Sequence, residues 1–136
     1  MRFFAVIVIA ALCSGCGTIA AQSEQQELQV TLYAYGNAIR WNGFEDGLKY
    51  IDPQTLKDHP VTELDMQRYR QVRVTGYSEQ PAVASGPHEV TQTVQISVVN
   101  NNTQTERSFV DHQVWRYDEK SKHWHNVSGL PDITHH

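Results

Sequence analysis

Cysteine is scarce in this chain of 136 residues, and its two cysteines, Cys13 and Cys16, both lie among the first sixteen residues. Residues 17–136 therefore cannot be crosslinked by a disulfide, and a domain formed by them must be held together by its core. About 120 residues suffice to bury such a core without a crosslink or a metal. Internal repeats, heptad arrays and long low-complexity tracts are also lacking, which favours one globular domain.

Long hydrophobic runs are lacking too. The apolar run that follows Arg2 extends over about ten residues, from Phe3 to Leu12, whereas a membrane-spanning helix needs roughly twenty. A basic residue followed by a short apolar run is typical of a secretory signal. We therefore expect this segment to be removed by processing.

The end of this segment, Leu12-Cys13-Ser14-Gly15-Cys16, resembles the bacterial lipobox, whose usual form is Leu, a small residue, Gly or Ala, and then Cys. Here Cys13 stands where Leu is commonest. Cys13 could itself be the modified residue, although Leu12 is bulky for a cleavage position, and both cysteines could belong to a discarded signal. The resemblance implies lipidation of Cys16, a signal peptide over 1–15, a lipidated tether over 16–23 and one domain over 24–136.

A likeness to lipoproteins of Gram-negative bacteria also implies a location. Gly17 follows the cysteine, at the position where an Asp would favour retention in the inner membrane. The expected place is the outer membrane, with the polypeptide facing the periplasm. Two or three acyl chains, at about 0.8 kcal/mol per buried methylene, make a lasting anchor. The membrane is thus one expected partner.

Basic residues are too few for a nucleic-acid partner. The formal net charge of −4 becomes −5 when residues 1–15 are removed, because Arg2 is the one charged residue among them. Nucleic-acid binding calls for a basic face instead.

Catalytic motifs are missing as well, since no Ser stands in a Gly-x-Ser-x-Gly elbow and no Gly-rich phosphate loop is present. We expect no cofactor.

Helical patterns fill the first half of the domain. From Glu24 onward, apolar residues recur at helical spacing, with Ser23 as a candidate cap. The members of this stripe are Leu28, Leu32, Tyr35 and Ile39. Asn42 and Glu45 have the spacing of a capping box for a second helix, whose apolar face would hold Phe44, Leu48 and Ile51. Asp52-Pro53 ends that helix and can start another short one.

Beyond Met66 the hydrophobic period changes to two, which predicts strands. Val72 and Val74 alternate with polar residues, as do Val90, Val94, Ile96 and Val98. Further strands are expected over 103–117 and 123–128, and turns over 85–87, 100–102 and 118–122. Short connections favour antiparallel neighbours. The predicted fold is α+β, with the N-terminal helices packed on a twisted antiparallel sheet of about four strands.

Residues 24–131 resemble the nuclear transport factor 2-like superfamily, a cone-shaped fold shared with ketosteroid isomerase. The likeness rests on the element order and on two segments, Tyr35-Gly36-Asn37-Ala38-Ile39-Arg40-Trp41-Asn42 and Val114-Trp115-Arg116-Tyr117. Ser128-Gly129-Leu130-Pro131 after a Trp-rich hairpin is similar to small lipoproteins of proteobacteria. The superfamily holds enzymes and non-enzymes, so the likeness implies architecture alone. It also implies that homodimers can form through an open sheet face.

A cone of this kind would place several polar and aromatic residues inside. Asp111 and Gln113 lie between Phe109 and Trp115 on one face of the third strand. Asp111 could then be a general base with a raised pKa, or a structural, hydrogen-bonded Asp. The candidate pocket residues are Tyr35, Trp41, Asp111, Gln113 and Trp115. Packing in the core is the simpler interpretation of the aromatic residues.

Histidines gather near the end of the chain. His112, His123 and His125 fall on strands expected to be neighbours. A zinc site needs three or four ligands that converge at about 2.1 Å, and these histidines have no Cys and no acidic residue at a familiar spacing. We interpret them as surface residues and predict no metal.

Two functions remain open. The first is a non-enzymatic envelope lipoprotein, a binding or support module anchored by Cys16 with an envelope protein or a second copy as partner. The alternative is a small-molecule binder or an isomerase- or dehydratase-like enzyme that uses the cone cavity. An open cavity around Asp111 would favour the alternative, and a filled interior would disfavour it.

Overall fold

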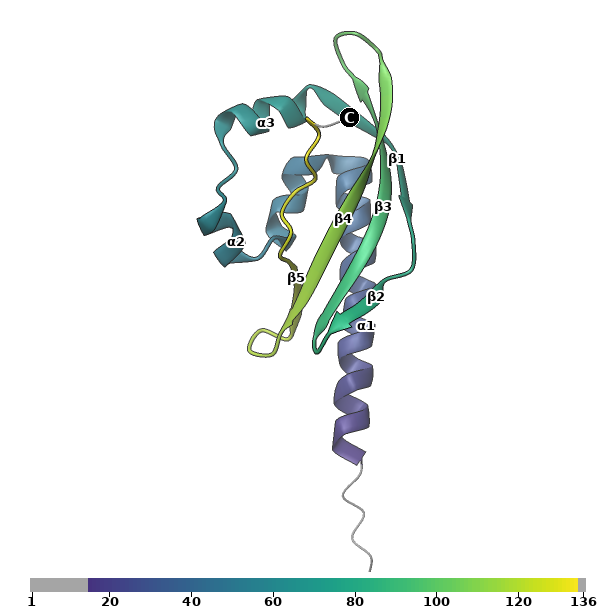
Figure 1. Ribbon diagram of the computed structural model, residues 1–136, viewed down its shortest axis with the longest axis vertical. Coiled ribbons are helices and arrows are strands. Elements are labelled where there is room, and N and C mark those ends of the chain that lie inside the picture. The colour runs from purple at the N-terminus through teal and green to yellow at the C-terminus, as the bar shows by residue number, and fades with distance from the viewer. Residues whose placement is uncertain (1–14, 135–136) are drawn as a thin grey trace, which may run out of the picture.

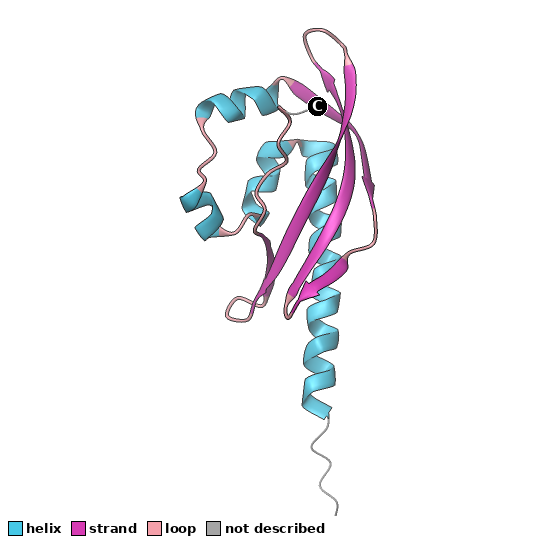
Figure 2. Ribbon diagram, viewed as in Figure 1, coloured by secondary structure: helices cyan, strands magenta, loops and turns pink. Residues whose placement is uncertain are grey.

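The computed structural model describes residues 15–134 and shows the predicted α+β fold (Figures 1 and 2). All the helices precede all the strands along the chain. The helical elements are α1 (Gly15–Asn37), the π-helical η1 (Ala38–Asn42), the 3-10 helix η2 (Phe44–Tyr50), α2 (Pro53–Asp58) and α3 (Glu63–Arg70). The strands are β1 (Val72–Glu79), β2 (Val83–Gly86), β3 (Glu89–Asn100), β4 (Glu106–Asp118) and β5 (His123–Asn126).

The strands form one antiparallel sheet in the order β1-β3-β4-β5. The short β2 also pairs with β3, over the first residues of that strand, so β1 and β2 follow one another along the same side of β3. In the register of β3 and β4, Val94 lies opposite Asp111 and Val90 opposite Trp115. These pairs place the candidate pocket residues of β4 beside the apolar side chains of β3.

The core lies between α1 and the sheet, where both predicted periodicities are confirmed. Figure 1 shows α1 running along one face of the sheet. The predicted helical stripe is buried, with 5% or less of each residue exposed: Leu28, Leu32 and Tyr35 in α1 and Ile39 in the adjoining η1. The predicted inward residues of β3 are buried as well: Val90, Val94, Ile96 and Val98. The hydrophobic periods of about 3.6 residues in the helix and 2 residues in the strand thus identified the two surfaces that pack against each other.

The start of α1 differs from the prediction. The helix begins at Gly15 and continues through residues 16–23, so Ser23 lies inside the helix as an exposed residue and does not cap it. The physical reason is that Ala20, Ala21 and Gln22 are good helix formers, so extension from the packed part of the helix costs little. The predicted tether over 16–23 is thus helical in the structure.

A 3-10 helix, η2, replaces the second predicted helix, and the π-helical η1 ends the first one. Asn42 forms no capping box with Glu45, because its Nδ2 donates to Asp46 Oδ2 at 2.9 Å and Gly43, with φ of 100°, occupies the cap position of η2. The predicted cap at Asp52 is confirmed, since Thr55 N donates to Asp52 Oδ2 at 3.0 Å. Two residues of the predicted apolar face, Phe44 and Ile51, are 2% and 3% exposed.

Two elements had no counterpart in the prediction. The helix α3 follows a capping box in which Thr62 accepts from Asp65 N while the Asp65 side chain accepts from Thr62 N. The spacing of Thr62 and Asp65 was a signal for this start. The strand β2 has all four of its side chains exposed. It therefore carries no alternation from which it could be predicted.

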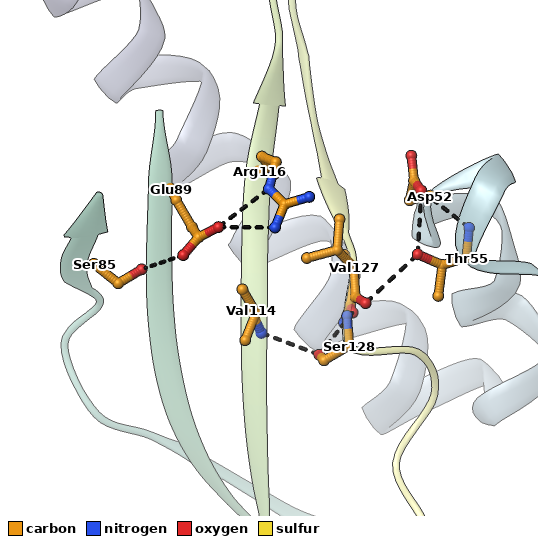
Figure 3. Close-up of polar contacts among 9 residues, drawn as sticks. Asp52, Thr55, Ser85, Glu89, Val114, Arg116, Val127 and Ser128 are labelled. Atoms are coloured by element: carbon orange, nitrogen blue, oxygen red, sulfur yellow. Dashed lines mark hydrogen bonds and ion pairs between the residues drawn. The ribbon is translucent and has the colours of Figure 1, made fainter. Parts of the chain in front are cut away.

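The segment after β5 forms hydrogen bonds with β4 and α2, some of which Figure 3 shows. Val114 N donates to Ser128 Oγ at 3.0 Å, and Thr55 Oγ1 donates to Val127 O at 3.5 Å. The Oδ1 atom of Asn126 accepts from Ser128 N, Ser128 Oγ and Gly129 N at 2.8 to 2.9 Å. These contacts join the end of the domain to both the sheet and α2.

Candidate functional site

The candidate pocket residues of β4 form a chain of hydrogen bonds centred on Gln113. Trp115 Nε1 donates to Gln113 Oε1 at 3.0 Å. The amide Nε2 of Gln113 donates to Asp111 Oδ2 at 2.9 Å and to the Tyr77 hydroxyl at 3.1 Å. Gln113 is 1% exposed, and these bonds satisfy its amide as a buried group requires. The alternation of β4 therefore brings Asp111, Gln113 and Trp115 together, as predicted.

Asp111 lies at the end of this series of hydrogen bonds and is half-buried. Burial raises the pKa of its carboxyl, while the hydrogen bond from Gln113 opposes that rise in pKa. The interpretation of Asp111 as a hydrogen-bonded structural residue fits this arrangement. Its hydrogen-bond partner is the uncharged amide of Gln113.

Tyr35 of α1 faces these hydrogen-bonded residues of β4 from the helical layer. Its ring packs edge-on against Trp115, with centroids 5.1 Å apart, and against Tyr50 at 5.7 Å. The side chain is fully buried, yet its hydroxyl has no hydrogen-bond partner among the described residues. Burial holds the pKa of Tyr35 well above its usual value, so the phenol stays neutral.

Trp41, the fifth candidate pocket residue, lies apart from this group. Its side chain is 70% exposed, and the Arg40 guanidinium carbon lies 4.1 Å from the centre of its ring. The physical reason is the π-helical turn of η1. A π turn adds a residue to the helical repeat and rotates the following side chains away from the stripe that α1 buries.

The interior around these residues is filled by side chains. Tyr35 and Trp115 are 0% exposed and Gln113 is 1% exposed, so the aromatic rings and the amide occupy the space that a substrate would need. Five surface hollows of about 150 to 360 Å³ are lined by other residues of the described part of the chain. The predicted residues come together, with Trp41 excepted, and they form a packed core.

The three predicted surface histidines do not converge. His123 Nδ1 lies 2.9 Å from Glu27 Oε1 of α1, and His112 Nδ1 lies 3.5 Å from Thr93 Oγ1. His125 pairs across the sheet with Arg116. Within residues 15–134, no group of three or more His, Cys, Asp and Glu side chains is arranged to hold a metal ion.

A contact that the prediction missed joins α1 to the two hairpin ends. His88, in the turn between β2 and β3, places Nδ1 2.7 Å from Glu24 Oε1 and Nε2 3.2 Å from Glu119 Oε1. Trp124 Nε1 of β5 donates to the backbone oxygen of Glu24 at 2.9 Å. With the pair of His123 and Glu27, these contacts hold one segment of α1, and we call them the hairpin clasp.

The hairpin clasp engages both charged residues of α1, because Glu24 and Glu27 are the two charged side chains in its sequence. The hydrogen bond to Glu24 raises the pKa of His88. Two acidic residues, Glu24 and Glu27, in an otherwise uncharged helix were the available sequence signal for these contacts. The partners could not be identified from the sequence, because they lie 64 and 96 residues away.

Beyond the hairpin clasp, α1 continues alone. Figure 1 shows its first turns extending past the ends of both hairpins. Residue 16, the predicted lipidation position, lies in the first turn of this projecting part. At 1.5 Å per residue, the eight residues from position 16 to Glu24 correspond to about 12 Å of helix.

In comparisons with known proteins, no family model and no curated protein matches this chain. Among the described residues, no helix combines the length and the apolar character needed to cross a membrane.

Proposed function

We propose that this chain is a non-enzymatic lipoprotein of the bacterial envelope, a binding or support module anchored by a lipid on Cys16. The projecting part of α1 carries this proposal. A lipid on residue 16 sits at the end of a helix that enters the folded domain without interruption up to Asn37. The helix then serves as a stalk that holds the domain off the membrane surface.

The hairpin clasp supports this role of α1. A stalk transmits orientation only if it is fixed to the domain that it carries. Buried packing fixes α1 from Leu28 onward, and the contacts of His88, His123 and Trp124 fix the turn before it. The tether is then a rigid extension of about 12 Å, in contrast to a flexible linker.

The filled interior favours a binding module over an enzyme in the cone. A catalytic Asp111 would need space for a substrate beside its carboxylate, and Tyr35, Gln113 and Trp115 occupy the neighbouring volume. The outer membrane, with the domain facing the periplasm, remains the proposed location. The nuclear transport factor 2-like assignment remains a proposal drawn from the order of the elements.

Metabolic labelling tests the anchor directly. The full chain, expressed in a Gram-negative host with an alkyne-bearing fatty acid, should incorporate the label and sediment with the membrane fraction. Cys16→Ser should abolish the label, since the serine hydroxyl cannot form the thioether, and should leave the signal segment uncleaved. Cys13→Ala is the matched control and should keep both the label and the sedimentation with membranes. Label that depends on Cys13 instead of Cys16, or no label in the unaltered chain, would overturn the proposal.

A further inference from the structure

A groove runs between α1 and β1, on the side of the helix away from β5. It consists of two adjoining hollows of about 360 and 150 Å³. Both hollows are lined by Leu32, Tyr33 and Glu79, so they form one continuous surface feature, which we call the α1–β1 groove. The connection between β1 and β2, residues 80–82, forms one end of it.

Side-chain amides dominate the polar lining of this groove. Three glutamines come from three separate segments: Gln29 of α1, Gln80 after β1 and Gln92 of β3. Each amide offers two donors and an acceptor. The apolar lining comes from Leu32, Pro81 and Ala82. Tyr33, which is 71% exposed, supplies an accessible aromatic ring.

The charges in the groove are balanced and already engaged. Glu79 and Arg40 are its one acidic and one basic side chain. Arg40 donates to Val74 O at 2.9 Å, and Glu79 accepts from Gln92 Nε2 at 3.4 Å. A groove with amides, one accessible ring and no net charge matches an uncharged ligand that carries many hydroxyl or amide groups.

Gln92 is held rigidly at the inner side of the groove. Its side chain is buried, with the residue 6% exposed, and its Nε2 donates to Gln80 O at 3.0 Å. That bond fixes the orientation of the amide, yet its buried Oε1 accepts no hydrogen bond from any described residue. An unsatisfied buried acceptor costs about 1–3 kcal/mol. That oxygen has almost no solvent-accessible surface, so Gln92 forms a fixed wall of the groove, and the accessible amides are those of Gln29 and Gln80.

Gly36 shapes the other end of the groove. A Cβ atom built on Gly36 would lie 2.9 Å from Tyr77 Cε1, so the absence of a side chain lets the Tyr77 ring pack beneath α1. The Tyr77 hydroxyl accepts from Gln113, which ties this end of the groove to the rigid core. The groove is therefore preformed, which lowers the entropic cost of binding.

We propose that the α1–β1 groove binds a glycan built of N-acetylated hexosamines. A sugar ring stacks on Tyr33, because the apolar face of a pyranose fits an aromatic face. The acetamido group pairs with the exposed amides of Gln29 and Gln80, and its methyl group contacts Leu32 and Ala82. This inference deepens the proposed function by naming a ligand class, and it rests on that function only for the compartment where the glycan is met.

Titration of the purified full chain with two oligosaccharides tests the assignment. The two probes are the β-1,4-linked tetramers of N-acetylglucosamine and of glucose, which share their linkage and differ in the acetamido group. Calorimetry or amide chemical shifts should show binding of the acetylated sugar in the millimolar range or tighter, with glucose tetramer at least threefold weaker. No binding of the acetylated sugar at millimolar concentration, or equal binding of both sugars, would overturn the proposal.

Two variants on the same helix assign the binding to the groove. Tyr33→Ala should weaken binding by about threefold to tenfold, as expected for one aromatic contact. Val30→Ala is the matched control, since Val30 is 63% exposed and lines a different hollow on the other side of α1, and it should leave binding unchanged. Equal binding by the Tyr33 variant and the unaltered chain would contradict the proposal.

This assay distinguishes the two proposals of function. Binding of a soluble sugar does not depend on acylation, so a failed titration leaves the lipid anchor standing. An unmodified Cys16, in turn, leaves the groove proposal standing. Both variants change exposed side chains, so circular dichroism should show unaltered folding and keep a loss of binding attributable to the groove.

Discussion

His88 Nδ1 lies 2.7 Å from Glu24 Oε1, and this contact connects a hairpin turn of the sheet to the last turn of α1 before the helix leaves the domain. The same imidazole reaches Glu119 through Nε2 at 3.2 Å, and its ring stacks on Tyr117 with centroids 6.1 Å apart. The next residue, Glu89, forms an ion pair with Arg116 (Figure 3). His88 thus faces two carboxylates and no cation among these groups.

The hairpin clasp should therefore depend on pH. The pKa of His88 is raised by the hydrogen bond to Glu24, so its contribution to stability is complete below the unfolded value of about 6.5 and is lost as the pH rises through the folded pKa. Hydrogen exchange of the α1 amides from Glu24 to Leu28 should become faster, relative to the core amides, across this pH range.

Variants of two histidines separate this effect from general titration. His88→Gln should remove most of the change in exchange with pH. His112→Gln is the matched control, because His112 is exposed and its ring nitrogen lies beside the uncharged Thr93 hydroxyl. Equal pH profiles for the His88 variant and the unaltered chain would contradict this function of the clasp.

Removal of the Tyr35 hydroxyl should not weaken the domain. That hydroxyl is buried with no hydrogen-bond partner within residues 15–134, and an unsatisfied polar group costs about 1–3 kcal/mol. Tyr35→Phe should therefore leave the free energy of unfolding unchanged or raise it by about 1 kcal/mol. Tyr35→Ala should lower it by about 3–5 kcal/mol because it leaves a cavity. Urea unfolding measures both, and a clear loss of stability in the Phe variant would show that the hydroxyl has a partner.

Asp111→Asn should stabilise the protein at neutral pH. Burial raises the pKa of Asp111, so the ionised form is disfavoured in the folded state, and stability falls as the pH rises from the unfolded value of about 3.9 through the folded pKa. An Asn at this position still accepts from Gln113 and carries no charge. Urea unfolding at two pH values should show a gain at pH 7 that disappears near pH 4. A less stable Asn variant at pH 7 would show that the charge is needed.

Gly47→Ala should destabilise the packing between η2 and α1. A Cβ at this position would lie 2.7 Å from Ile39 Cδ1, 3.1 Å from Leu130 Cδ2 and 3.2 Å from Tyr35 Cε2. Overpacking of this kind costs about 1–3 kcal/mol, which thermal unfolding would detect. Gly86→Ala is the control, since its nearest atom, Glu89 Cβ, would be 3.9 Å away. Equal melting temperatures for the two variants would contradict the tight packing at Gly47.

Periodicity alone was sufficient for the main surfaces of the fold. The helical stripe from Leu28 in α1 to Ile39 in η1 and the alternation in β3 identified the buried faces. The alternation in β4 placed Asp111, Gln113 and Trp115 together. These predictions succeeded because side-chain direction follows directly from helix and strand geometry.

Other features depend on information that local patterns do not contain. The outward position of Trp41 follows from the π turn of η1, which no spacing of apolar residues announced. The pairs of His88 with Glu24 and of His123 with Glu27 form only after both hairpins fold back onto α1. The α1–β1 groove likewise combines residues from α1, β1 and β3, and only the tertiary structure brings these segments together.

The lipid anchor is tested most directly by the mass of the N-terminal peptide released from the full chain after expression in a Gram-negative host. We predict that this peptide begins at Cys16 and carries the added mass of a diacylglycerol thioether. A peptide that begins elsewhere, or one that begins at Cys16 and has the mass of the unmodified amino acids, would contradict it.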